Sequence, residues 1–256
     1  MALIHLNFYS EALGMETQVM VILPQKSSAG QIGIASSNNN AENYKCLYLL
    51  HGLSDDQTIW MRRTSIERYA AQYGICVVMP CGGRSFYCDC KHGMAYYTYI
   101  AKELPKRIQE FFRVSGKRED NYIAGLSMGG YGAMKIALRD PDSYCACAAL
   151  SPVCDLDTMA GMGFDSVMLS LFGEFKTPDE DSVMFLAEKH KNHPNKPRVY
   201  MAMGTDDFLY ENSIPLRKRL TDNHYDFTYV EEKANHNWAF WDAQIQNVLK
   251  WMFDKE

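Results

Sequence analysis

A serine between two glycines is the first candidate for chemistry in this chain. Ser127 lies in Gly125-Leu126-Ser127-Met128-Gly129, between an apolar stretch at 121–124 that predicts a buried strand and a stretch at 131–139 that predicts a helix. A serine at the sharp corner between a strand and a helix is called a nucleophile elbow. Side chains at the two glycine positions would collide with the neighbouring strand and helix. The pattern therefore predicts a serine nucleophile.

A serine hydroxyl is a poor nucleophile at neutral pH, so it needs a histidine to take its proton and an acid to orient that histidine. His236 follows the last predicted strand, 227–230, where it would share one edge of a parallel sheet with Ser127. It is therefore the predicted base. His51 precedes the serine and adjoins Gly52, which favours a structural role. The other histidines lie in a predicted hairpin, in loops or before the last strand: His5, His92, His190, His193 and His224.

The acid should follow the strand before the last one. The predicted strand 198–203 leads into Gly204-Thr205-Asp206-Asp207, and spacing alone does not separate the two aspartates. Asp155 and Asp157 follow an earlier strand and are a third choice, although loop solvation or helix capping is the interpretation we favour for both. The chain order of serine, acid and histidine is the order found in α/β-hydrolases.

Acyl transfer to a serine creates an oxyanion, which backbone N–H groups stabilise. One donor should be Met128, directly after the serine and at the start of the predicted helix. The second should come from the loop after the apolar run 46–50, which predicts a strand buried on both faces. Leu53 is the predicted donor in that loop, with Gly52 as the next choice.

Strands and helices alternate from residue 46 onward, which predicts a mostly parallel sheet covered by helices on both faces. Before it, stretches 3–9 and 17–23 predict an antiparallel hairpin, and 24–45 predicts a surface loop. Further strands are expected at 75–80 and 145–150, and helices at 60–73, 96–112, 166–172, 179–190, 211–222 and 239–253.

The composition limits the class of protein. The 256 residues, 47% of them apolar, suffice for a single domain, 1–256. A net charge of −5 without a basic block argues against nucleic acid as a partner. No apolar run reaches the roughly eighteen residues of a membrane span, and the N-terminus does not resemble a signal peptide, so we expect no membrane partner and a cytoplasmic location.

Eight cysteines raise the question of disulfides or a metal. A chain of this length does not need disulfide bonds for stability, and several cysteines adjoin apolar strand-like runs. We therefore expect free thiols in a reducing compartment. Cys88-Asp89-Cys90 has no second cysteine pair at zinc spacing, so a metal site there is the weaker alternative and we predict none.

Four motifs resemble the esterase D family of α/β-hydrolases, most closely the bacterial tributyrin esterases and more distantly the S-formylglutathione hydrolases. They are His-Gly-Leu-Ser-Asp-Asp at 51–56 with Trp60, Glu-Leu-Pro at 103–105, Ala-Gly-Leu-Ser-Met-Gly-Gly-Tyr-Gly-Ala at 124–133, and Gly-Thr-Asp-Asp-Phe-Leu at 204–209. The likeness covers nearly the whole chain. It implies an α/β-hydrolase fold with Ser127, Asp207 and His236 as catalytic residues and Leu53 and Met128 as oxyanion donors.

The resemblance also implies the reaction. It implies a serine carboxylesterase that hydrolyses small-molecule esters of short acyl groups, acetyl to butyryl, through an acyl-serine intermediate, without a cofactor and as a homo-oligomer (dimer or tetramer). Residues 153–196 lie where relatives carry a lid or cap over the site. Relatives usually have Trp before Tyr where this chain has Phe86-Tyr87, which affects the shape of the pocket. Residues expected to bind substrate are Gly52, Phe86, Tyr87, Met159, Phe164 and Trp238.

Acyl-serine chemistry is shared by several activities, so alternatives stay open. One is a thioesterase of the S-formylglutathione hydrolase type, and another is an esterase that removes acetyl or feruloyl groups from carbohydrate. A different class would be a hydrolase fold that binds ligands without catalysis. The intact set of Ser127, Asp207 and His236 argues against this last alternative.

Overall fold

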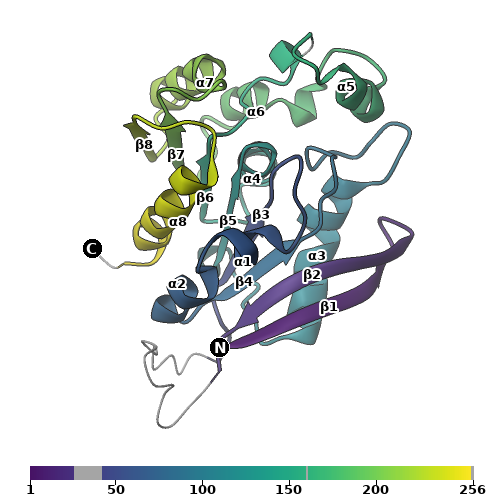
Figure 1. Cartoon of the computed structure of the whole chain (residues 1–256), viewed down its shortest axis with the longest axis vertical. Helices are drawn as coiled ribbons and strands as arrows, with labels where there is room; N and C mark the ends of the chain where they lie inside the picture. Colours follow the sequence, from purple (N-terminus) through teal and green to yellow (C-terminus); the bar gives the residue numbers. More distant parts are fainter. Residues whose placement is uncertain (26–41, 160, 255–256) are drawn as a thin grey trace.

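A computed structural model describes residues 1–25, 42–159 and 161–254 of the chain. An eight-stranded sheet crosses the molecule in the order β1-β2-β4-β3-β5-β6-β7-β8 (Figure 1). Neighbours from β4 to β8 pair in parallel, whereas β1 and β2 form an antiparallel hairpin that joins β4 antiparallel. This topology confirms the predicted sheet and hairpin. The strands are β1 (Ala2–Ser10), β2 (Met15–Leu23), β3 (Cys46–Leu50), β4 (Cys76–Pro80), β5 (Asn121–Leu126), β6 (Ala146–Leu150), β7 (Arg198–Gly204) and β8 (Phe227–Glu232).

The central strands are apolar on both faces because both faces are covered. In β3, Cys46, Tyr48 and Leu50 belong to one core, whereas Leu47 and Leu49 belong to the other. Helices α3 to α7 contribute to the first core, and α1, α2 and α8 contribute to the second. The helices are α1 (Ile59–Arg63), α2 (Ile66–Tyr73), α3 (Leu104–Phe111), α4 (Met128–Arg139), α5 (Asp165–Phe172), α6 (Val183–Lys189), α7 (Tyr210–Asp222) and α8 (Trp238–Phe253).

The single helix expected at 60–73 is wrong, because the chain breaks between α1 and α2. Thr64 is extended, and its Oγ1 donates a hydrogen bond to the carbonyl of Trp60 at 2.6 Å. The same oxygen accepts one from the N–H of Ile66 at 3.1 Å. A threonine side chain that bonds to neighbouring backbone groups competes with the helical hydrogen bonds.

The helix expected at 96–112 is also not regular. Residues Thr98–Glu103 form a π-helix, and the α-helical part, α3, begins only at Leu104. Pro105 has no N–H group to donate to the preceding turn, so a wider turn before it is the local solution. Instead, the N–H of Leu104 reaches back to the carbonyl of Tyr99.

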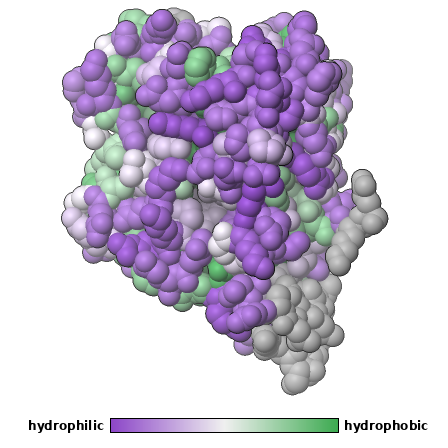
Figure 2. Space-filling model, turned by 180° about the vertical axis from the view of Figure 1, so that it is seen from behind, coloured by the Kyte–Doolittle hydropathy of each residue, from purple (hydrophilic) through white to green (hydrophobic). Residues whose placement is uncertain are grey.

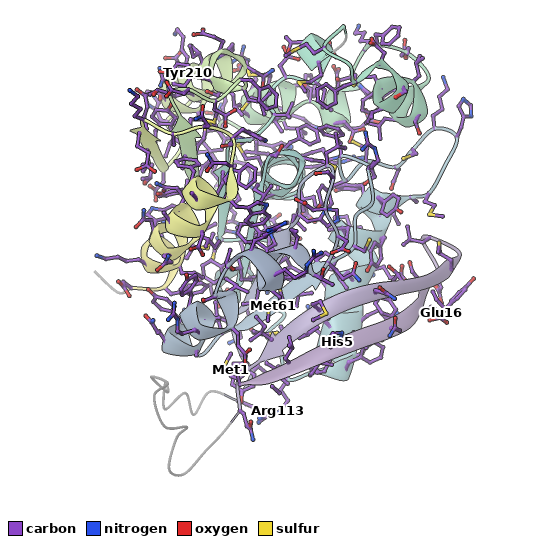
Figure 3. All side chains as sticks on the ribbon, viewed as in Figure 1. Met1, His5, Glu16, Met61, Arg113 and Tyr210 are labelled. Atoms are coloured by element: carbon purple, nitrogen blue, oxygen red, sulfur yellow. The ribbon has the colours of Figure 1, made fainter. Side chains whose placement is uncertain are left out.

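The segment 153–196 contains α5 and α6, which lie with α7 along the top of the molecule in Figure 1. Most of the surface loop expected at 24–45 lies outside the described residues. Side chains fill the space between the sheet and its helices in Figure 3, whereas His5 and Glu16 lie on the hairpin, away from these layers.

The face of the molecule seen in Figure 2 is mainly hydrophilic, with apolar residues scattered between charged and polar ones. Within the described residues, no helix is long and apolar enough to cross a membrane. In the same part of the chain, no group of three or more His, Cys, Asp or Glu residues is arranged to hold a metal ion.

Candidate active site

Ser127 occupies a strained corner between β5 and α4. Its φ of 52° and ψ of −117° lie where side chains are rarely tolerated. The corner is tight, since a Cβ on Gly125 would lie 2.3 Å from the carbonyl oxygen of Gly129. A Cβ on Gly129 would lie 2.5 Å from the carbonyl oxygen of Leu50 in β3. Helix α4 begins directly after the serine, so the helix N-terminus lies beside its hydroxyl group.

A chain of hydrogen bonds joins this serine to a histidine and an aspartate. His236 Nε2 lies 3.0 Å from Ser127 Oγ, and His236 Nδ1 lies 2.9 Å from Asp207 Oδ2. The carboxylate accepts a hydrogen bond from the N–H at Nδ1, which leaves the Nε2 lone pair facing the hydroxyl group. These side chains come from loops after β5, β7 and β8. The arrangement can move a proton from the serine to the imidazole.

Asp207 is buried, whereas its neighbour Asp206 is exposed. Burial alone would raise the pKa of Asp207, but the hydrogen bond and charge of His236 and the N–H of Leu209 outweigh it and lower the pKa below its ordinary value. The carboxylate therefore stays charged at neutral pH. Of the two aspartates, the structure brings Asp207 to the histidine.

The loop after β3 lies beside the serine at one cavity, and His51 fixes its position. The Nδ1 of His51 donates to the carbonyl of Gly52 at 2.7 Å, and its Nε2 accepts from the N–H of Gly82 at 2.8 Å. Burial lowers the pKa of His51, so the ring is neutral and serves both bonds. Gly52 and Leu53 then line a cavity together with Ser127.

This cavity has a volume of about 230 Å³. Among the residues expected to bind substrate, Gly52, Phe164 and Trp238 line it. Aromatic rings form much of its wall, and Phe208 packs 4.8 Å from the ring of His236. The lining residues are Gly52, Leu53, Ser54, Asp55, Arg84, Leu126, Ser127, Phe164, Phe208, His236, Trp238 and Trp241.

Phe86, Tyr87 and Met159 are not among these lining residues; they are buried in the core. Phe86 and Tyr87 have φ values of 48° and 56°, which turn both rings inward. The Tyr87 hydroxyl donates to the carbonyl of His51 at 2.9 Å, and its ring lies where a Cβ on Gly132 would be. These two aromatic residues therefore belong to the core beside the site and do not line its cavity.

Several residues of the cavity were not expected from the sequence. Asp55, Arg84 and Phe208 lie in loops that follow β3, β4 and β7. The rule that sites gather at the carboxyl ends of parallel strands applies to them as well. Applied to every such loop, it would have identified them.

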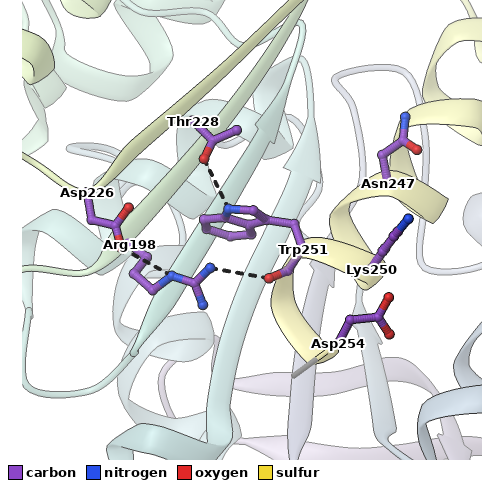
Figure 4. Close-up of a pocket in the computed structure, with 7 residues that line it drawn as sticks. All are labelled: Arg198, Asp226, Thr228, Asn247, Lys250, Trp251 and Asp254. Atoms are coloured by element: carbon purple, nitrogen blue, oxygen red, sulfur yellow. Dashed lines mark hydrogen bonds and ion pairs between the residues drawn. The ribbon is translucent and has the colours of Figure 1, made fainter. Parts of the chain in front are cut away.

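A larger hollow of about 840 Å³ lies at the opposite ends of β7 and β8 (Figure 4). Some of its polar groups bond to one another: Arg198 pairs with Asp226 at 3.3 Å, and Trp251 Nε1 donates to Thr228 Oγ1 at 3.1 Å. The guanidinium of Arg198 also covers the ring of Trp251 at 4.4 Å. No serine or histidine is found among the described residues that line this hollow, so the size of a hollow alone does not locate the chemistry.

Comparisons with known proteins identify the family of the chain. A family model described as "Putative esterase" matches residues 10–252. An acetyl esterase from Caldicellulosiruptor saccharolyticus is 30% identical over 98% of both chains.

Two solved structures from Staphylococcus aureus are similar over 99% of both chains. The fluorophosphonate-binding serine hydrolase FphF is 32% identical with a TM-score of 0.88, and the S-formylglutathione hydrolase FrmB is 33% identical with a TM-score of 0.86. These matches confirm the predicted α/β-hydrolase fold and the predicted enzyme class, a serine hydrolase of carboxylic esters. The chain belongs to this esterase family.

Proposed function

We propose that the enzyme hydrolyses small esters of short acyl groups, acetyl to butyryl, through an acyl-serine intermediate on Ser127. The observation that carries this proposal is the 3.0 Å contact between His236 Nε2 and Ser127 Oγ, with Asp207 on the other ring nitrogen. His236 takes the serine proton as Oγ attacks the carbonyl carbon and then passes it to the departing alcohol. A water molecule then attacks the acyl-serine with the same proton transfers through His236, which releases the acid and restores Ser127.

Two backbone N–H groups, those of Leu53 and Met128, are the proposed oxyanion donors. Met128 is the first residue of α4, so its N–H has no partner within the helix and is free to donate. Leu53 lines the cavity beside Ser127. The loss of one such donor typically lowers turnover by about a hundredfold or more.

The cavity volume of about 230 Å³ supports a short acyl group, because drug-sized ligands occupy pockets of about 300–1,000 Å³. A second candidate is thioester hydrolysis, which the likeness to the S-formylglutathione hydrolase FrmB favours. Both activities use the same acyl-serine, and only the leaving group differs.

The test combines labelling and kinetics. A fluorophosphonate probe should label the wild type and not Ser127→Ala, and that variant should lose hydrolysis of p-nitrophenyl acetate and butyrate. Ser170→Ala, which removes an exposed serine of α5, is the matched control. Unlabelled wild type would refute the serine mechanism. A series of acyl chain lengths beside S-formylglutathione and acetylated or feruloylated xylan fragments ranks the substrate classes.

Three further properties belong to this proposal. The chain acts as one domain, in which 153–196 caps the site. Two observations support this position of the segment: Phe164 lies in the cavity wall, and the Lys135–Asp181 ion pair joins α4 to the segment. The location is cytoplasmic, which fits eight cysteines without a disulfide. The enzyme forms a dimer or tetramer, which light scattering after gel filtration would test.

A further inference from the structure

The side chain of Arg84 lies in the wall of the Ser127 cavity without a protein partner. It is exposed, and within the described residues no group accepts a hydrogen bond from it or pairs with its charge. Other arginines of the chain do find partners: Arg107 pairs with Glu110 at 2.9 Å and Arg217 with Glu231 at 3.2 Å. A guanidinium presents five donors in a planar fork that matches a carboxylate.

The backbone that carries Arg84 is held on both sides. Before it, the N–H of Gly82 donates to His51 Nε2 at 2.8 Å. After it, Ser85 Oγ donates to the carbonyl of Gly82 at 2.6 Å and accepts from the N–H of Tyr87 at 2.9 Å. Because His51 also bonds to Gly52, this loop is tied to the loop that carries the proposed oxyanion donor Leu53. The position of the Arg84 Cα relative to the serine is therefore fixed, and only its side chain needs to adjust to a ligand.

Among the described residues that line the cavity, only Asp55 carries a charge opposite to that of Arg84. Its Oδ2 lies 2.9 Å from the position that a Cβ on Gly52 would occupy, so the carboxylate lies against the Gly52 backbone. No described residue pairs with the carboxylate of Asp55, and it does not neutralise Arg84 although both line the same cavity. A substrate carboxylate is thus attracted by Arg84 and repelled by Asp55. Removing the charge of Arg84 should therefore weaken the preference for anionic esters, and removing the charge of Asp55 should strengthen it.

We propose that Arg84 is a specificity residue that binds a carboxylate of the substrate, so that the enzyme prefers esters that carry one carboxylate group. The inference rests on the proposed function, because it concerns substrates of the same serine. The remaining wall is mostly apolar and aromatic, with Phe164, Phe208 and Trp238, which suits the rest of a small acid ester.

Matched esters test the proposal. 4-Acetoxybenzoate and 4-acetoxybenzamide share the acetyl group and the ring and differ in charge on the leaving group. Mono-p-nitrophenyl adipate and p-nitrophenyl hexanoate place the same difference on the acyl half. For each pair, the kcat/KM of the anionic ester is divided by that of the neutral ester. Comparing this ratio between variants cancels the intrinsic reactivities of the two esters.

Arg84→Gln should lower this ratio about tenfold or more in one of the two pairs, because a charge-assisted hydrogen bond is lost. Arg84→Lys should retain part of the preference, since it keeps the charge without the planar fork. Asp55→Asn should raise the ratio in the same pair. The control is Arg63→Gln, which removes an exposed charge at the end of α1, outside the cavity, and should leave the ratio as in the wild type.

The pair that responds identifies the half of the ester that Arg84 contacts. A ratio within twofold of the wild type in both pairs for Arg84→Gln would overturn the proposal. This result differs from failure of the proposed function, in which the wild type would hydrolyse neither the neutral nor the anionic esters.

Discussion

Gly204 and Ala234 approach each other so closely that a Cβ on Gly204 would lie 2.2 Å from the carbonyl oxygen of Ala234. Gly204 ends β7 shortly before Asp207, and Ala234 precedes His236 in the loop after β8. The contact continues in a hydrogen bond from the N–H of Asp206 to the same carbonyl at 3.0 Å. The end of β7 and the loop after β8 are thereby held together, which sets the separation of the aspartate and the histidine.

Gly204→Ala should therefore raise the activation free energy of the reaction by more than it lowers the free energy of unfolding. The added Cβ would meet backbone atoms of Ala234, which cannot rotate away, so the two loops must move apart. A shift of about 1 Å in a catalytic group can cost about a hundredfold in rate. We expect kcat/KM for p-nitrophenyl acetate to fall by about that factor. Gly116→Ala is the control, because its Cβ would meet only the movable end of Gln109, at 2.9 Å from Oε1. Unchanged kinetics in Gly204→Ala would show that this contact does not set the geometry.

The sequence predicts the strands and the loops after them because parallel strands that are buried on both faces consist of consecutive apolar residues. Ser127 directly follows such a run, and His236 lies in the loop after the predicted strand 227–230, which suffices to place both residues at one edge of the sheet. The runs do not separate Asp206 from Asp207, because their orientations depend on the contact with Ala234, far along the chain. The resemblance to a known family was needed to choose between them.

The walls of the cavity were harder to predict from the sequence. Phe86 and Tyr87 adopt left-handed backbone conformations that aromatic residues rarely take, so their rings turn into the core. The break of the helix at Thr64 depends on a side chain that bonds to the backbone of Trp60 and Ile66. Propensities include neither the packing of side chains in the core nor side-chain bonds to nearby backbone groups.

Asp207→Asn should abolish most of the activity, because an amide at this position no longer favours the histidine tautomer that accepts the serine proton. The expected loss in kcat is about 10³- to 10⁴-fold, by analogy with the same change in serine proteases. Asp206→Asn should retain nearly full activity, since Asp206 is exposed and does not contact the histidine. Steady-state kinetics of both variants decides, and the reverse order of effects would contradict the assignment.

His51 should make the fold sensitive to mild acid. Burial lowers its pKa from 6.5. Below pH 6.5, His51 is therefore protonated in the unfolded chain more readily than in the folded protein. The stability contributed by the neutral ring is complete above pH 6.5 and is lost as the pH falls towards the lower pKa of the folded state. Calorimetry should show the Tm decreasing between about pH 7 and 5.

His51→Gln should lower the Tm at pH 7, because the Gly52 and Gly82 bonds weaken, and should reduce its dependence on pH. His5→Gln, a change at an exposed position on β1, is the control and should leave that dependence as in the wild type (Figure 3). An equal slope in His51→Gln and the wild type would exclude His51 as the source.

Removing only one partner of the ion pair between Lys135 and Asp181 should lower the free energy of unfolding substantially. Lys135 Nζ is fully buried and lies 2.9 Å from Asp181 Oδ1 and 2.7 Å from the carbonyl of Tyr87. Burial alone would lower the pKa of Lys135, but Cys88 and Asp181 outweigh it and raise the pKa, so the amine remains charged. Asp181→Asn leaves that charge without a carboxylate, which typically costs about 3–5 kcal/mol in the free energy of unfolding.

Adding Lys135→Met to Asp181→Asn should restore much of this loss, because the unpaired buried charge is gone. Glu180→Gln, at the exposed neighbouring position, should change the free energy of unfolding by less than about 0.5 kcal/mol. Urea unfolding of the three variants measures these differences. A double variant no more stable than Asp181→Asn would mean that the cost comes from lost packing between α4 and the segment 153–196. Recovery would show that it comes from the isolated charge.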